Sequence, residues 1–117
     1  MFRNLVGQRI ALHSAQKIDK EGAAAVRREF GIELPADAWA TGIVAVATLD
    51  RYFSPTDTGE PLLESPWYSG RYGWVFRDVV PVLAVECLGQ QGFWDVPADV
   101  ARRVWYRRAV ELAKRAK

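Results

Sequence analysis

The densest group of side chains that could bind a nucleobase lies between residues 65 and 74 (SPWYSGRYGW). Trp67, Tyr68 and Trp74 are aromatic, and Arg71 lies among them. Aromatic rings and arginine planes stack on unpaired bases, so this run favours binding of a single-stranded nucleic acid. The alternative is structural: Trp74 belongs to the core and Trp67 covers one end of the sheet.

A polar group formed by His13, Ser14 and Lys17 follows at the end of the first predicted strand. An imidazole, a hydroxyl and an ammonium in this arrangement could bind an anion or the polar edge of a base. His13 is the only histidine, so in an enzyme it would be the natural proton-transfer group, with Lys17 stabilising negative charge. Alternatively, the backbone satisfies the ring of a strand-end histidine.

A third candidate is the polar segment at residues 89–94 (GQQGFW), which carries two amide side chains followed by two aromatic rings. Glycines stand on both sides of the two glutamines, as they do in tight turns. The simpler interpretation of this segment is therefore a hairpin turn between two short strands.

Positive charge is concentrated at the C-terminal end. From Pro97 onward there are seven basic residues and two acidic ones, a net charge of +5, so the first 96 residues carry −3. The central arginines of this region are Arg102, Arg103, Arg107 and Arg108. Such asymmetry points to a polyanionic partner. The alternative is a solvated helix face whose basic residues suit the helix dipole.

Several classes of function lack their sequence motifs. The chain has no HExxH or CxxC spacing, no phosphate-binding glycine loop and no GxSxG turn, so we expect neither a metal nor a cofactor. Cys87 is the single cysteine and reads as a buried, inert thiol. A dyad of Cys87 with His13 has little support. No apolar run reaches ~18 residues, so we expect a cytoplasmic protein that does not contact membranes.

Strands dominate the predicted elements, with one helix among them. A helix covers residues 19–30, with Asp19 as its N-cap and Gly31 ending it. Residues 54–70 form a long loop, and Pro81 should stop strand pairing where it stands. The predicted strands cover residues 5–14, 43–53, 71–82, 83–88 and 92–95.

A final helix at residues 97–115 completes the fold. Pro97 opens it, and an apolar stripe at helical spacing should face the core. The stripe consists of Ala101, Val104, Trp105, Ala109, Leu112 and Ala116. We therefore predict one α+β domain over residues 1–117, built on a small β-barrel or curled mixed sheet of five to six strands with flanking helices.

Four segments, in order along the chain, resemble the motifs of the ASCH domain family, which belongs to the PUA-like superfamily. They are residues 10–17 (IALHSAQK), 42–47 (GIVAVA), 65–75 (SPWYSGRYGWV) and 89–94 (GQQGFW). The resemblance covers about residues 6–97. It implies a PUA-like barrel with a cleft between barrel and helix, and RNA-related binding. Some family members are enzymes, including an amidohydrolase that acts on acylated cytidine and reported ribonucleases.

One departure from the family pattern affects the functional expectation. Family members carry an upstream G-x-K-x-[IVT]-[ET]-x-R segment that holds the residues credited with amidohydrolase activity. This sequence begins just after the place where that segment would lie, so we expect either a short member or a chain whose true start lies upstream. No catalytic residue is therefore carried over, and we expect the missing strand to leave an open sheet edge that favours homodimerisation.

Three functional hypotheses follow. The first is binding of RNA or a modified nucleobase in a cleft lined by His13, Ser14, Lys17, Trp67, Tyr68, Arg71 and Trp74, with the arginines of the last helix attracting phosphates. The second is a ribonuclease or nucleoside hydrolase, in which His13 and Lys17 act. The third is a protein-interaction domain that uses the open edge and the basic helix.

Overall fold

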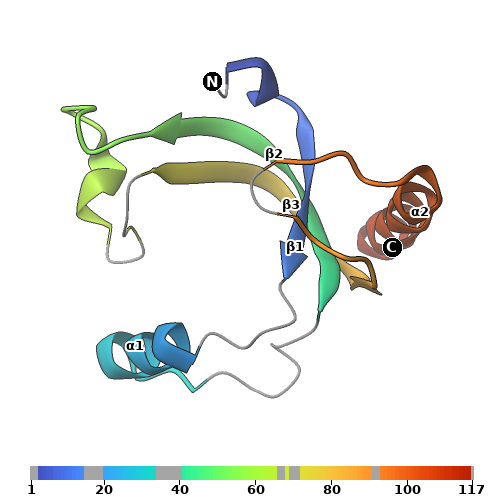
Figure 1. Cartoon of the computed structure of the whole chain (residues 1–117), viewed down its shortest axis with the longest axis horizontal. Coiled ribbons are helices and arrows are strands. Elements are labelled where there is room, and N and C mark those ends of the chain that lie inside the picture. Colours follow the sequence, from blue (N-terminus) through green and yellow to red (C-terminus); the bar gives the residue numbers. More distant parts are fainter. Residues whose placement is uncertain are drawn as a thin grey trace.

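The protein is an α+β fold around one antiparallel sheet of three strands in the order β1-β2-β3 (Figure 1). The computed structural model describes residues 3–14, 20–33, 41–65, 68, 72–90 and 93–116. The strands are β1 (Arg9–Ser14), β2 (Gly42–Phe53) and β3 (Gly73–Val85), and the helices are α1 (Lys20–Phe30) and α2 (Ala98–Arg115). Two short 3-10 helices, η1 (Arg3–Leu5) and η3 (Pro61–Glu64), complete the set.

The prediction of a barrel or mixed sheet of five to six strands is wrong for the described part of the chain. Residues 71–82 and 83–88 do not form two strands, because β3 runs through Pro81 to Val85 without a break. Residues 93–95 join no strand. Pro81 is tolerated because β3 is an edge strand, where a residue without an N–H group costs no ladder bond on the open side.

The strand predicted at residues 43–53 is central in the sheet, as its apolar sequence indicated. Every residue from Ala45 to Leu49 on β2 is buried, and Ile43 and Phe53 are buried near its two ends. β1 pairs with one side of β2 and β3 with the other, both antiparallel. A strand enclosed in this way needs apolar side chains on both faces.

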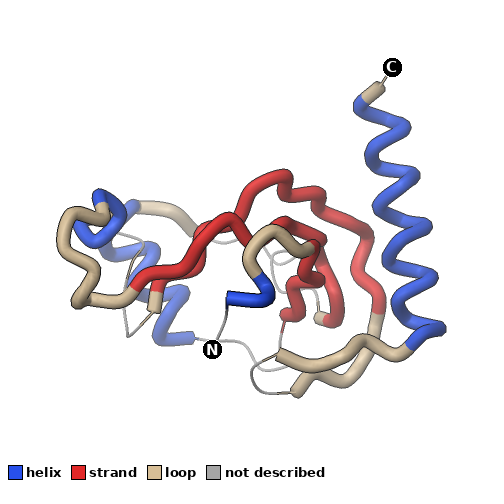
Figure 2. Tube along the Cα trace, turned by 90° about the horizontal axis from the view of Figure 1, so that it is seen from above, coloured by secondary structure: helices blue, strands red, loops and turns tan. Residues whose placement is uncertain are grey.

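The β2–β3 pair is strongly curled (Figure 2). Its register shifts at three places, between Ile43 and Ala45, between Val46 and Thr48 and between Leu49 and Arg51. Extra residues at such bulges bend a strand and increase its twist. At the second shift Asp78 takes a φ of 52°, a conformation that aspartate adopts more readily than most residues.

The helix α2 packs against the sheet at the end of the β2–β3 pair opposite η3 (Figure 1). Val100 and Val104 are its buried residues and join Ile43, Val46 and Val85 in one cluster. The predicted bounds of this helix differ by one residue from the observed ones. The predicted inner stripe is right for Val104, which is buried, and wrong for Trp105 and Leu112, which are 45% and 37% exposed.

The helix predicted at residues 19–30 is confirmed as α1 over its described residues. Gly31 follows it with a φ of 66° and donates its N–H to the carbonyl of Arg27, as a C-terminal glycine does. None of the residues of α1 is buried. Over the described ranges, no helix has the length and apolar character needed to cross a membrane.

Candidate nucleic-acid interface

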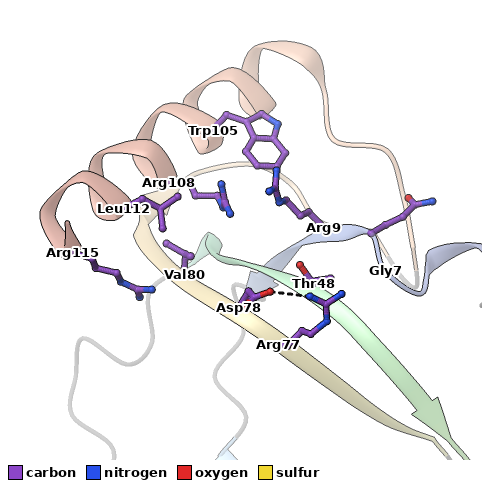
Figure 3. Close-up of a pocket in the computed structure, with 11 residues that line it drawn as sticks. Gly7, Arg9, Thr48, Arg77, Asp78, Val80, Trp105, Arg108, Leu112 and Arg115 are labelled. Carbon is purple, nitrogen blue, oxygen red and sulfur yellow. Dashed lines mark hydrogen bonds and ion pairs between the residues drawn. The ribbon is translucent and has the colours of Figure 1, made fainter.

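A groove of about 850 Å³ separates α2 from the sheet (Figure 3). Trp105, Arg108, Leu112 and Arg115 enter it from α2 and face Arg9 on β1 and Arg77, Asp78 and Val80 on β3. The remaining lining residues are Gly7, Gln8 and Thr48. Four arginines, a single carboxylate and one tryptophan therefore line the same groove, and this combination is typical of a surface that binds a polyanion.

Two of these arginines lie against the same indole ring. The guanidinium carbon of Arg9 is 5.8 Å from the centroid of the Trp105 ring, and that of Arg108 is 5.5 Å away. Within the described residues, neither guanidinium has a carboxylate partner. Two guanidinium groups that lie on one indole without a carboxylate partner favour the approach of an anion.

The Nε atom of Arg108 adds an unused donor to this cluster. It is buried and has no hydrogen-bond partner among the described residues. A buried donor without a partner costs free energy.

Helical spacing explains why these side chains share one face. Trp105, Arg108, Leu112 and Arg115 follow one another at intervals of three, four and three residues, which places them along one side of a helix. The sequence interpretation missed this face because it assigned Trp105 to the core. The spacing of arginines around an aromatic residue was the signal that could have found it.

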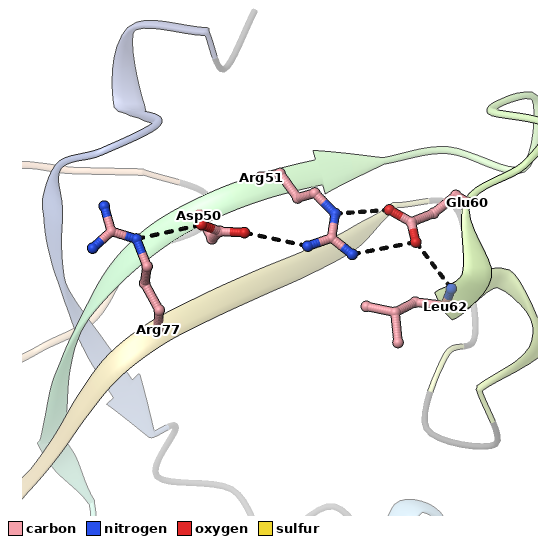
Figure 4. A network of polar contacts seen from close by, with 5 residues as sticks. All are labelled: Asp50, Arg51, Glu60, Leu62 and Arg77. Carbon is pink, nitrogen blue, oxygen red and sulfur yellow. Dashed lines mark hydrogen bonds and ion pairs between the residues drawn. The ribbon is translucent and has the colours of Figure 1, made fainter.

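Arg77 differs from the other groove arginines because it is paired. Its Nη1 lies 3.0 Å from Asp78 Oδ2, and its Nε lies 3.3 Å from Asp50 Oδ1. Asp50 also contacts Arg51, whose Nε is 2.8 Å from Glu60 Oε1 (Figure 4). Among the described residues, the groove arginines without a carboxylate partner are therefore Arg9, Arg108 and Arg115.

Glu60 fixes the far end of this network. Its side chain is 10% exposed and accepts from Arg51 and from the backbone N–H of Leu62, which it caps at the start of η3. Hydrogen bonding to Arg51, followed by the bond from Leu62, lowers the pKa of Glu60 below its usual value. The loop that contains η3 is thus tied to β2 by an ionised carboxylate.

The four arginines predicted to bind phosphate do not form one surface. Arg108 lines the groove, whereas Arg107 turns to β3 and donates to the backbone carbonyls of Leu83 and Ala84. Arg103 is exposed, with its Nη2 3.9 Å from Asp99 Oδ2, and Arg102 is exposed outside the groove lining. Only one of the four therefore contributes directly to this site.

His13 occupies a well-defined place at the end of β1. Its Nε2 donates to the carbonyl of Cys87 at 2.8 Å, because a carbonyl can only accept. Trp94 meets the imidazole edge-on, with 5.7 Å between ring centroids. A Cβ atom on Gly89 would lie 2.6 Å from the imidazole Cε1, so the backbone there passes directly beside the ring. The backbone therefore satisfies one ring nitrogen of His13, as the structural interpretation of this residue predicted.

Residues 93 and 94 connect two of the groups singled out from the sequence. Phe93 contacts Trp74 edge-on, with 5.4 Å between ring centroids, and its neighbour Trp94 contacts His13.

The other predicted site residues lie apart from this contact. Tyr68 packs on Phe53 with 5.0 Å between ring centroids, and its hydroxyl is buried with no hydrogen-bond partner among the described residues. Ser14 ends β1 opposite Gly42. Lys17, Trp67 and Arg71 lie outside the described residues.

Other chemistry has little support in the described ranges. Cys87 is half-buried, and this burial raises the pKa of its thiol above the usual value. Nowhere in those ranges do three or more His, Cys, Asp or Glu side chains form a group that could hold a metal ion.

No protein-family model, no curated protein and no solved structure matches this chain. The resemblance to the ASCH domain family therefore stays a prediction.

Proposed function

We propose that the protein binds single-stranded RNA along the groove between α2 and the sheet. The observation that carries this proposal is the placement of Arg9 and Arg108 on one exposed indole, at 5.8 and 5.5 Å from its centroid, without carboxylate partners in the described chain. The two guanidinium groups bind consecutive phosphates, and Trp105 stacks on a base. Arg115 extends the positive surface toward the end of α2.

The hydrolase hypothesis has weaker support. It depends on His13, whose Nε2 donates to the carbonyl of Cys87, so only Nδ1 is left for proton transfer, and a Cβ on Gly89 would lie 2.7 Å from that atom. A general acid or base needs a ring nitrogen within hydrogen-bonding reach of the substrate. The protein-interaction hypothesis rests on the open edges of the sheet and is treated with the predictions below.

The test is fluorescence anisotropy of labelled single-stranded RNA, titrated with protein at several salt concentrations. Replacing Arg9 and Arg108 together with alanine should weaken binding and reduce the slope of log K against log salt by about 1.4, because each phosphate contact on a single strand contributes roughly 0.7. The matched control replaces Arg102 and Arg103 with alanine, which removes the same charge outside the groove lining. This control should keep a slope close to that of the native protein.

Two results would contradict the proposal. One is an equal loss of slope in both double variants, which would show that net charge alone attracts the RNA. The other is RNA binding at low salt no tighter than that of an unrelated domain with the same net charge.

A further inference from the structure

A row of three polar residues crosses the sheet on the floor of the groove. Arg9 on β1 pairs with Thr48 on β2, and Thr48 pairs with Arg77 on β3. Residues directly opposite each other on neighbouring strands share one face of a sheet, with Cβ atoms roughly 4.5–5.5 Å apart. All three residues line the groove, and Figure 3 shows Thr48 between the two arginines.

An irregularity in the pairing of β2 with β3 brings Arg77 into this row. Val46 pairs with Val80, two positions from the row. Regular antiparallel pairing would then set Asp78 opposite Thr48. The register shifts at this point, Asp78 takes a φ of 52°, and Arg77 pairs with Thr48 instead. Such bulges redirect side chains and are common beside functional sites.

Thr48 contributes a hydroxyl that no described residue uses. The residue is 7% exposed, and its hydroxyl makes no hydrogen bond within the described part of the chain. The oxygen itself is not enclosed, so it is open to the groove that the residue lines. Buried polar residues are normally hydrogen-bonded, so an unused hydroxyl that opens into a groove indicates a ligand there.

The two arginines of the row are held differently. Arg77 is fixed by Asp78 at its Nη1 and by Asp50 at its Nε, and its Nη2 makes no hydrogen bond with a described residue. This pairing neutralises part of its charge but limits the freedom that it loses on binding. Arg9 has no carboxylate partner in the described ranges. The row therefore offers three donor groups, one from each strand.

We infer that this row is a subsite for a terminal phosphate of the bound RNA strand. The inference rests on the proposed RNA binding, in which Trp105 and Arg108 take the adjoining base and the next phosphate. A terminal phosphate has three free oxygens and a charge of about −1.5 to −2 at neutral pH. An internal phosphodiester has two free oxygens and a single charge. Three donor groups match the terminal phosphate and exceed what the diester can use.

The test compares three forms of one labelled oligomer, with a 5′-phosphate, with a 3′-phosphate, or with hydroxyls at both ends. One phosphorylated form should bind at least about tenfold more tightly than the hydroxyl form. Thr48→Val removes the hydroxyl but keeps the shape and the charge, and it should reduce this preference about tenfold, because hydrogen bonds to charged groups are strong. Thr48→Ala is a second variant without the hydroxyl and should behave in the same way.

Two controls keep the preference. Thr48→Ser retains a hydroxyl at the same position. Thr58→Val makes the same chemical change at an exposed position outside the groove. Both should show the preference of the native protein for the phosphorylated end.

The preference is a ratio of two affinities measured with one variant, so a loss of affinity common to all oligomers cancels. The Thr48 variants keep the charge of the protein, so any general attraction of the extra phosphate is also unchanged. An unaltered ratio in Thr48→Val and Thr48→Ala would overturn this inference and leave the proposed function standing. So would equal binding of all three oligomers by the native protein. Failure of every oligomer to bind would overturn the proposed function itself.

Discussion

The guanidinium of Arg107 lies against the backbone of β3 at Leu83, with its Nη1 2.9 Å from the carbonyl oxygen. The same nitrogen also donates to the carbonyl of Ala84. These carbonyls lie near the C-terminal end of an edge strand. A residue that looks like part of a phosphate-binding surface in the sequence therefore joins a helix to a sheet.

Arg107→Ala should lower the free energy of unfolding by roughly 1–2 kcal/mol, because hydrogen bonds from a charged donor contribute more than neutral ones. Arg103→Ala is the control and should change it by less than about 0.5 kcal/mol, since its ion pair is long and exposed. Urea unfolding of both variants measures the difference. Equal effects would show that the Arg107 contacts do not stabilise the protein.

Truncation of two neighbouring residues on α2 should lower stability by different amounts. Val104 is 4% exposed within the core cluster, so Val104→Ala should cost roughly 2 kcal/mol of stability. Trp105 is 45% exposed and mainly contacts arginine side chains, so Trp105→Ala should cost about 1 kcal/mol or less. Thermal or urea unfolding compares them. A larger cost at Trp105 would mean that it is the core anchor.

Glu60 should make stability depend on pH in the acid range. Its folded-state pKa lies below the usual 4.5, so the folded state holds the charged form more strongly than the unfolded chain does. The contribution is therefore fully present above about pH 4.5 and is lost as the pH falls through the folded-state pKa. Glu60→Gln should remove this part of the dependence.

The measurement for Glu60 is the melting temperature between neutral and strongly acid pH. Glu64→Gln, an exposed change in the same 3-10 helix, is the control. A native-like acid profile in Glu60→Gln would show that the contacts with Arg51 and Leu62 do not stabilise the loop.

Two glycines with positive φ allow the cost of backbone strain to be separated from the cost of a steric collision. Gly42 has a φ of 96°, and a Cβ there would collide with the backbone carbonyl of Val85. Gly31 has a φ of 66° with open space around it. Gly42→Ala should cost about 3 kcal/mol or more, and Gly31→Ala about 1 kcal/mol. Similar values from urea unfolding would show that the chain at Val85 moves away easily.

Homodimerisation through a sheet edge stays a prediction, and the structure favours β1 as the edge. On β3, Pro81 lacks an N–H group and Arg107 occupies carbonyls at Leu83 and Ala84, so pairing there is hindered. Light scattering should show an average mass that rises with concentration. Amide hydrogen exchange at residues 9–14 of β1 should become slower over the same range of protein concentration. A monomer at high micromolar concentration would contradict the prediction.

The sequence predicted both helices well because their ends carry strong local signals. Pro97 precedes α2, and Gly31 follows α1. The central strand was also predictable, since its apolar residues occupy both faces. The number of strands was not predictable, because a proline followed by apolar residues is compatible both with one continuous strand and with the start of a new one. That choice depends on which side of the strand lies open, and this is a tertiary property.

The site was harder to predict than the elements. An amphipathic pattern identifies a buried face only when apolar residues are confined to it, and on α2 both Val104 and Trp105 fit a stripe. The strong curl of β2 and β3 decides that the valines face the core. The proximity of Arg9 to Arg108, nearly one hundred residues apart in sequence, could not be inferred from local spacing.

The order of the strands has a consequence for how the chain folds. β2 packs on β3 across a connection of residues 54–72, and β3 packs on α2 across residues 86–97, whereas β1 and β2 are separated by the longer connection of residues 15–41. Closing that loop carries the larger entropic cost. We expect β2, β3 and α2 to form the folding nucleus and β1 to dock last. Truncations in β1 should then accelerate unfolding, and truncations in β2 or β3 should slow folding.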